Sequence, residues 1–166
     1  MHKNNHRKAM ESQLSHIPGF RGCSHKQLAE IDRLTDRTTV LPGRYLVQEG
    51  MIGHELFVIL SGTAAVTRRG RMITTMGPGD YFGELAAIDT NYRNASLTAI
   101  TTLEVLVIGP RELSSLMGDI PGFRDALLRG MARRLRAADD TIDRMSAAES
   151  SGPLAEIHRF EARESV

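Results

Sequence analysis

The middle of the chain alternates between short apolar runs and glycine-containing turns. The turns fall at Pro42-Gly43, Glu49-Gly50, Ser61-Gly62, Arg69-Gly70 and Gly77-Pro78-Gly79. Between them lie Tyr45–Val47, Leu56–Leu60, Ala64–Thr67, Met72–Met76 and, later, Val105–Ile108. Short strands at regular spacing predict a closed or rolled antiparallel sheet from Thr38 to Ile108. By itself the pattern supports a small β-barrel or a jelly roll and does not choose between them.

A helical pattern precedes this sheet. Ser24 and Gln27 have the spacing of a capping box, in which each side chain bonds the other residue's backbone N–H. Apolar residues then recur every third position, at Leu28, Ile31 and Leu34. We therefore expect a helix that begins after Ser24 and packs one face on the core.

Helical periodicity returns after Ile108. A short helix is predicted from Gly109-Pro110 to Gly118-Asp119, and Pro121 suits the first turn of a long helix ending near Ala147. Apolar residues of this helix are spaced three and four apart, at Leu128, Met131, Leu135, Ala138, Ile142 and Met145.

This spacing is a heptad seam, which favours pairing with a second copy. We predict a homodimer through Leu128, Met131, Leu135, Ala138 and Ile142. In the alternative, the same stripe packs onto the chain's own sheet, although Phe123, Ala126 and Leu127 are available for that contact.

Composition narrows the class of protein. The 166 residues are 41% apolar and 25% charged with a net charge of +1, which is ordinary for a globular domain and indicates neither a DNA-binding nor a membrane surface. The single cysteine excludes an internal disulfide, and no secretion signal is present, so we expect a cytoplasmic protein. His2 and His6 have no carboxylate or cysteine partner at a metal-binding spacing, so no metal is expected. The sequence contains no recognisable pair of a nucleophile and a base, so we do not expect an enzyme.

The stretch from Tyr81 to Ala99 has the most specific chemistry. Gly83 and Glu84 open a short helical run, and Arg93 follows ten residues after Gly83. Glycine allows a ligand to approach the backbone, and the N–H groups of a helix start attract anions. An arginine returning to the same point suits one phosphate, and a carboxylate beside it suits a sugar hydroxyl. The alternative is a phosphate-free turn in which Arg93 pairs with Glu84.

Residues Phe82 to Leu97 resemble the phosphate-binding cassette of cyclic nucleotide-binding domains, roughly F-G-E-[LI]-A-L, a short loop and R-x-A-[TS]-[VL]. The resemblance implies an α+β fold: an antiparallel eight-stranded β-roll, similar to a jelly roll, with an N-terminal helix and a long C-terminal helix. The expected parts are an N-terminal arm (1–15), the helix plus β-roll (16–118), the dimerisation or lid helix (119–148) and a flexible tail (149–166).

The resemblance also assigns roles. The ligand would be 3′,5′-cyclic AMP, with cyclic GMP as the alternative. Arg93 would pair with the cyclic phosphate, supported by the N–H groups of Leu85 and Ala86, while Glu84 would accept from the ribose 2′-hydroxyl and Gly83 would let the sugar approach. Asn94 would contact the phosphate or the base, and Ile73 and Thr74 would wall the base. The run Met131–Leu135 resembles the central helix of catabolite activator proteins, which implies that Arg134 and Ala138 lie near the purine.

The sequence departs from the family pattern at several positions. Tyr92 replaces a common proline, Asn94 replaces a small or hydroxyl residue, and Ala138 and Asp139 stand where the activators have hydroxyl residues. The stretch after the long helix is too short for a helix-turn-helix module, so we expect a non-enzymatic sensor without its own output domain, acting through an unknown protein effector. The alternative function is a β-roll scaffold for protein interactions that has lost nucleotide binding. A transcription factor would need a separate DNA-binding subunit.

Overall fold

The computed structural model describes residues 11–89 and 92–150. The chain forms two compact units, residues 1–127 and residues 128–166. All strands of the described residues belong to the first unit, and the described part of the second unit is the rest of one long helix.

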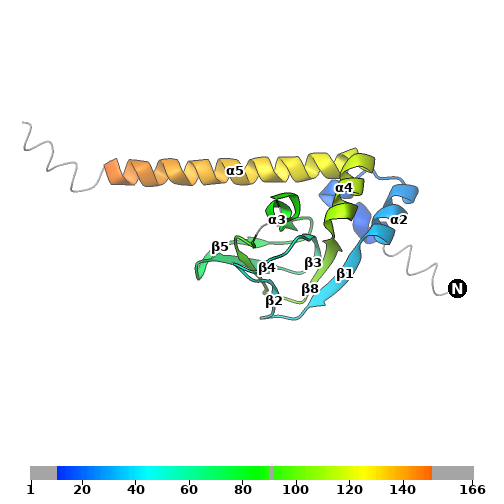
Figure 1. Cartoon of the computed structure of the whole chain (residues 1–166), viewed down its shortest axis with the longest axis horizontal. Coiled ribbons are helices and arrows are strands. Elements are labelled where there is room, and N and C mark those ends of the chain that lie inside the picture. Colours follow the sequence, from blue (N-terminus) through cyan, green and yellow to red (C-terminus); the bar gives the residue numbers. More distant parts are fainter. Residues whose placement is uncertain (1–10, 90–91, 151–166) are drawn as a thin grey trace, which may run out of the picture. The chain divides into compact units, whose positions relative to one another are not determined.

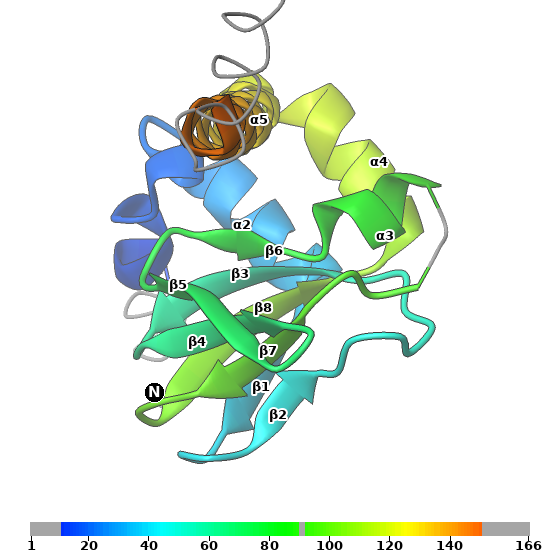
Figure 2. The same ribbon diagram turned by 90° about the vertical axis from the view of Figure 1, so that its left-hand side faces the viewer.

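Eight antiparallel strands form two four-stranded sheets, which Figures 1 and 2 show as two layers. The first sheet has the order β1 (Asp36–Val40), β8 (Leu103–Ile108), β3 (Leu56–Ser61) and β6 (Tyr81–Phe82). The second has the order β2 (Tyr45–Val47), β7 (Ser96–Ala99), β4 (Ala64–Arg68) and β5 (Arg71–Met76). The predicted eight-stranded α+β fold is confirmed.

The core between the sheets explains the apolar runs. Phe57 and Ile59 of β3 belong to it, together with Val66, Leu97 and other buried side chains. Side chains alternate along a strand, so Leu56, Val58 and Leu60 point to the other face of the sheet, where they are also buried. Because β3 is covered on both faces, its sequence is a continuous apolar run rather than an alternating one.

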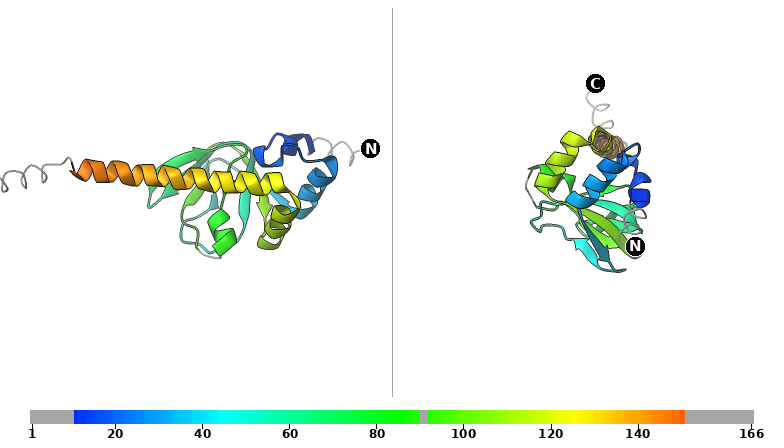
Figure 3. Two further views of the ribbon diagram at one scale, coloured as in Figure 1. Left: turned by 90° about the horizontal axis from the view of Figure 1, so that it is seen from above. Right: turned by 90° about the vertical axis from the view of Figure 1, so that its right-hand side faces the viewer.

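Besides a helical segment at residues 11–15, the described residues form the helices η1 (Pro18–Phe20), α2 (His25–Leu34), α3 (Glu84–Asp89), α4 (Pro110–Asp119) and α5 (Pro121–Ser150). The capping box predicted at the start of α2 is confirmed: the Gln27 N–H donates to the Ser24 hydroxyl, and the Ser24 N–H donates to the Gln27 side chain at 2.9 Å. The short and long helices predicted after the sheet are confirmed as α4 and α5. Helices α2 and α4 lie at the same end of the sheets (Figures 1 and 3).

An aromatic cluster joins three elements of the first unit. The rings of Phe20 in η1 and Phe123 in the first turn of α5 are stacked, with centroids 5.3 Å apart. Tyr81 of β6 meets Phe123 edge-on at 6.0 Å. Phe123 and Leu127 are buried, so the start of α5 is part of the core of the first unit, as the sequence predicts.

Some segments differ from the sequence-based expectation. Residues 11–15, expected to belong to a polar arm, are helical, and Leu14 is fully buried because it packs into the core. The apolar pattern does not predict strands β1 and β6, because four of the five residues of β1 are polar and β6 has only two residues. The remaining arm (1–10) and most of the expected tail (151–166) lie outside the described residues.

Within residues 11–89 and 92–150, no helix combines the length and the apolar character that a membrane span requires. The same residues contain no group of three or more histidine, cysteine, aspartate or glutamate side chains that could hold a metal ion. His2 and His6 lie outside the described part of the chain.

Candidate functional site

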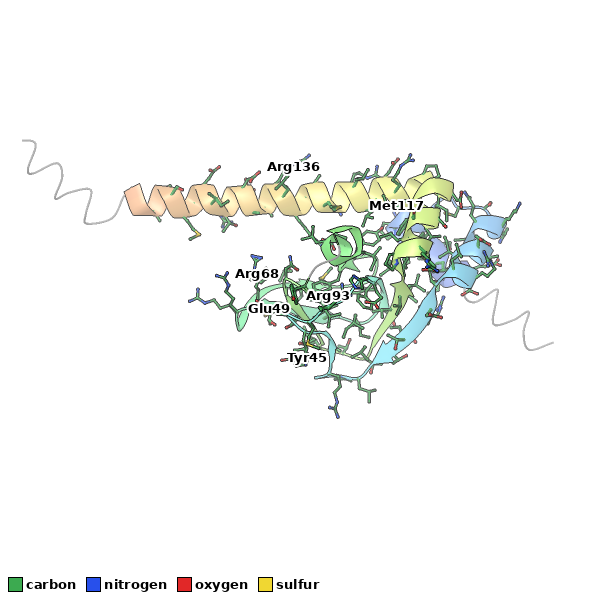
Figure 4. The ribbon with its side chains drawn as sticks, in the orientation of Figure 1. Tyr45, Glu49, Arg68, Arg93, Met117 and Arg136 are labelled. Atoms are coloured by element: carbon green, nitrogen blue, oxygen red, sulfur yellow. The ribbon has the colours of Figure 1, made fainter. Side chains whose placement is uncertain are left out.

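Arg93 is a buried cation at the centre of the site, with a relative exposure of 4% (Figure 4). Its Nη2 donates to the Glu55 carboxylate at 2.9 Å, and its Nη1 donates to the Glu55 backbone carbonyl, also at 2.9 Å. The Phe57 ring lies over the guanidinium, and its centroid is 5.3 Å from Arg93 Cζ. Burial lowers the pKa of Arg93, and the carboxylates of Glu55 and then Glu84 oppose that shift. The guanidinium is thus held as a positioned cation.

The backbone around Arg93 is fixed from the neighbouring turn. The Arg93 N–H donates to the Met51 carbonyl and the Gly50 N–H donates to the Arg93 carbonyl, each at 2.8 Å. Gly53 packs against the guanidinium, and a Cβ there would lie 2.5 Å from Arg93 Nε. Only glycine fits this contact without displacing the arginine.

Gly83 brings the start of α3 to the same point. Its φ of 89° lies in the left-handed region that favours glycine. A Cβ at Gly83 would clash with Arg93 Nη1 and lie 2.6 Å from the Glu55 carbonyl oxygen. The first turn of α3 then follows, and the N–H groups of a first helical turn have no acceptor within the helix. The structure therefore joins a buried guanidinium to a helix start, as the chemistry of a phosphate site requires.

The remaining cassette residues differ in exposure. Glu84 is buried at 6% relative exposure, Leu85 is half-exposed, and Asn94 is exposed. Ala86 lies in α3, but its side chain is outside the described part of the structure.

The residues expected at the base lie on other elements. Thr74 of β5 pairs with Val66, which belongs to the core between the sheets, so Thr74 is on the inner face of its sheet. Ile73 lies at a register irregularity beside it, and both residues are exposed. Arg134 and Ala138 are exposed positions of α5 in the second unit. Their role at the purine stays a prediction.

Sequence reasoning missed the role of Glu55. This residue immediately precedes the apolar run of β3, and a carboxylate placed next to a buried strand was an available signal. Its partner Arg93 is 38 positions away in the chain, which hides the pair from any local pattern.

A cleft of about 470 Å³ opens beside this ion pair. Arg93, Glu55 and Phe57 form one part of its wall. The other lining residues come mostly from β2 and the following turn: Tyr45, Leu46, Val47, Gln48, Met51, Ile52, Gly53 and, from β8, Val107.

Comparison with known proteins identifies the family. Residues 37–119 match the model of the cyclic nucleotide-binding domain. The chain belongs to this family. It is 30% identical to a CRP-like cAMP-activated global transcriptional regulator of Mycobacterium tuberculosis, over 88% of this chain and 67% of that protein.

Two further similar proteins are a protein kinase regulatory subunit and a catabolite activator protein. A cAMP-dependent protein kinase regulatory subunit of Yarrowia lipolytica is 35% identical over 55% of this chain and 26% of its own length. The crystal structure of the Thermus thermophilus catabolite activator protein is similar with a TM-score of 0.69 and 28% identity, covering 78% of this chain. This chain spans only 63% of that structure. The names of these relatives describe regulators rather than catalysts.

Proposed function

We propose that this protein is a non-enzymatic cyclic nucleotide sensor that binds 3′,5′-cyclic AMP at the Arg93 site. The observation that supports the proposal most strongly is the buried Arg93 guanidinium, which Glu55 holds next to Gly83, the residue that precedes α3. A buried cation with an acceptor that a ligand can replace is suited to one phosphate group.

Each group at the site would then have a defined role. The cyclic phosphate would bond Arg93 and the N–H groups of Leu85 and Ala86, and so take over part of the charge pairing that Glu55 provides. Glu84 would accept from the ribose 2′-hydroxyl. Thr74 and Ile73 would contact the base, with Asn94 at the phosphate or base, and Arg134 and Ala138 of α5 would approach the purine.

We further propose that the response passes through α5. Ligand binding favours one of two arrangements of the cassette and the helix, and the shift in population changes either a homodimer or the surface offered to a protein effector. The apolar stripe supports dimerisation, because the described part of the second unit is a single helix without a core of its own. Leu128, Leu135 and Ile142 of this stripe are 52–65% exposed.

A calorimetric titration with cyclic AMP, cyclic GMP and AMP tests the nucleotide site. We expect saturable binding of cyclic AMP, weaker binding of cyclic GMP and none of AMP at similar concentrations. Arg93→Ala should lose roughly 2–5 kcal/mol of binding free energy, because it removes the charge partner of a desolvated phosphate. That loss weakens binding about thirtyfold to several thousandfold.

Arg111→Ala is the matched control, since Arg111 is an exposed arginine of α4 outside the site. It should bind as the native chain does. Native-like binding by Arg93→Ala would show that the site is elsewhere. Absence of binding to every cyclic nucleotide would favour the scaffold function.

A further inference from the structure

The cleft beside the Arg93–Glu55 pair has a predominantly apolar wall. The apolar lining residues come from β2, the turn after it, β3 and β8: Leu46, Val47, Met51, Ile52, Phe57 and Val107. Met51 and Ile52 are 59% and 68% exposed, and Tyr45, which also lines the cleft, is 54% exposed. Small-molecule sites enclose most of their ligand, whereas exposed tyrosine and methionine are typical of protein interfaces. A cleft whose apolar residues reach solvent in this way therefore suits a protein segment.

The Glu55 carboxylate is the charged group that this wall offers to solvent. The Glu55 side chain is 47% exposed, whereas that of Arg93 is only 3% exposed. Glu55 Oε2 accepts from Arg93 Nη2 at 2.9 Å and from the His54 N–H at 3.1 Å. Within the described part of the chain, no hydrogen bond goes to Glu55 Oε1. The cleft thus combines apolar side chains with an accessible carboxylate oxygen, which fits a cationic side chain that has apolar neighbours.

Nucleotide binding would change the charge balance of this wall. Without a ligand, the charges of Arg93 and Glu55 cancel. A cyclic phosphate carries one negative charge, so its binding to Arg93 would leave the three groups with a net charge of −1. Because the guanidinium would then be shared between two anions, the excess charge falls on the more exposed one, Glu55. A cation that pairs with Glu55 restores neutrality.

We propose that this cleft docks a lysine- or arginine-bearing segment of the effector protein, and that the bound nucleotide strengthens the docking. The cation pairs with the Glu55 carboxylate, and the apolar residues beside it in the segment cover Met51 and Ile52. The inference rests on the proposed function, because the nucleotide at Arg93 supplies the change in charge. It adds a second response, within the first unit, to the response that passes through α5.

The test is fluorescence anisotropy of a short labelled peptide, titrated with the full chain with and without saturating cyclic AMP. The peptide has a central lysine, a leucine on each side of it, and glycine and serine at both ends. Cyclic AMP should tighten its binding about fivefold, as expected for a partly exposed ion pair. A control peptide with glutamine in place of lysine should bind equally with and without cyclic AMP. Calorimetry on the same samples measures cyclic AMP binding separately.

Variants of the ion pair separate the cleft from the nucleotide site. In Glu55→Gln, cyclic AMP should no longer tighten peptide binding. Arg93→Ala leaves Glu55 without its cation, so it should bind the peptide in the absence of cyclic AMP as tightly as the native chain does in its presence. Glu49→Gln removes an exposed carboxylate that does not line the cleft, and the amide keeps an acceptor for the Arg69 N–H. It should behave like the native chain.

The apolar wall is tested by Ile52→Thr. This change should weaken peptide binding about threefold with and without cyclic AMP, because less apolar surface is covered. Leu41→Thr is the matched control, since Leu41 is 62% exposed and does not line the cleft. A melting curve establishes that each variant is folded, and Glu55→Gln carries the test if Arg93→Ala does not fold.

The outcomes distinguish this inference from the proposed nucleotide site. Saturable binding of cyclic AMP with unchanged peptide affinity would overturn the inference and leave the nucleotide site standing. Tight peptide binding by Arg93→Ala, with no binding of cyclic AMP to the native chain, would support the cleft and overturn the nucleotide site. Equal tightening by cyclic AMP in Glu55→Gln or with the glutamine peptide would overturn the inference. Full competition by hexylammonium at the concentration of the peptide would also overturn it, because the cleft would then bind a small cationic molecule.

Discussion

At the scale of single residues, the site depends on how one buried charge is accommodated. The Arg93 guanidinium donates to the carboxylate and to the backbone carbonyl of Glu55. Gly53 and Gly83 leave room for this guanidinium, because a Cβ at either position would meet it. The sequence predicts Gly83, Glu84 and Arg93 as site residues because they lie within one short segment. Glu55 required the fold, since strand β3 and the cassette meet only in three dimensions.

Glu55→Gln tests this accommodation. The amide keeps an acceptor for Arg93 but removes the negative charge, so the unfolding free energy should fall by about 1–2 kcal/mol. This loss is smaller than for a fully buried pair because the Glu55 side chain is 47% exposed. Cyclic AMP should then raise the melting temperature of the variant more than that of the native chain, because the phosphate supplies the missing charge.

Differential scanning fluorimetry without cyclic AMP measures the loss of stability as a lower melting temperature. The same measurement with cyclic AMP gives the ligand-induced rise in melting temperature. Glu112→Gln is a suitable control, since Glu112 is outside the site in α4. An identical ligand-induced shift in Glu55→Gln and the native chain would contradict the idea that phosphate and Glu55 neutralise the same guanidinium.

At the scale of elements, α2, α4 and α5 follow local rules, whereas two strands and the helical segment at residues 11–15 do not. The start of α2 was predicted from the capping box, and α4 and α5 each begin at a proline in the first turn. Strand β1 is mostly exposed, and β6 is a two-residue strand that exists through its pairing with Phe57 and Val58. The hydrophobic periodicity of the chain does not predict β6, because this strand depends on its pairing with another strand.

Ser24→Ala tests how much the capping box contributes. It removes the acceptor for the Gln27 N–H and should destabilise the protein by about 1 kcal/mol. For a chain of this size the melting temperature should fall by roughly 2–4 °C.

Ser115→Ala is the matched control, because Ser115 is an exposed serine within α4 whose hydroxyl donates to the Arg111 carbonyl. Alanine is the better helix former, so this variant should be as stable as the native chain or slightly more stable. Equal losses in the two variants would mean that the Ser24 effect does not come from capping.

At the scale of the whole molecule, the chain is built from two units with different sources of stability. The first has a core between its sheets and further buried side chains on η1, α2, α4 and the start of α5. The described part of the second unit is helical and has an apolar stripe along one side. A helix of this kind gains most of its stability from burying such a stripe against another element.

Leu135→Asp tests the proposed dimer. Burying one leucine stabilises an interface by about 1.5–3 kcal/mol, and a symmetric dimer loses two, so the dimer constant should weaken by more than about a hundredfold. Sedimentation velocity should then show a monomer. Arg133→Asp introduces the same carboxylate off the stripe and should remain dimeric; if both variants sediment like the native chain, the stripe is not the dimer interface.

The sequence alone determined the features that arise within a few neighbouring residues: the capping box, the proline starts of the helices, the glycine turns and the order of groups in the cassette. It supported a small β-barrel or jelly roll, and the resemblance to a family was needed to specify an eight-stranded roll. Only the tertiary structure decided the pairing of Glu55 with Arg93, the pairing that creates β6, and the burial of β3 on both faces. The physical reason is that backbone propensity and capping act over one turn of chain, whereas a buried charge and a strand take their partners from residues that only folding brings together.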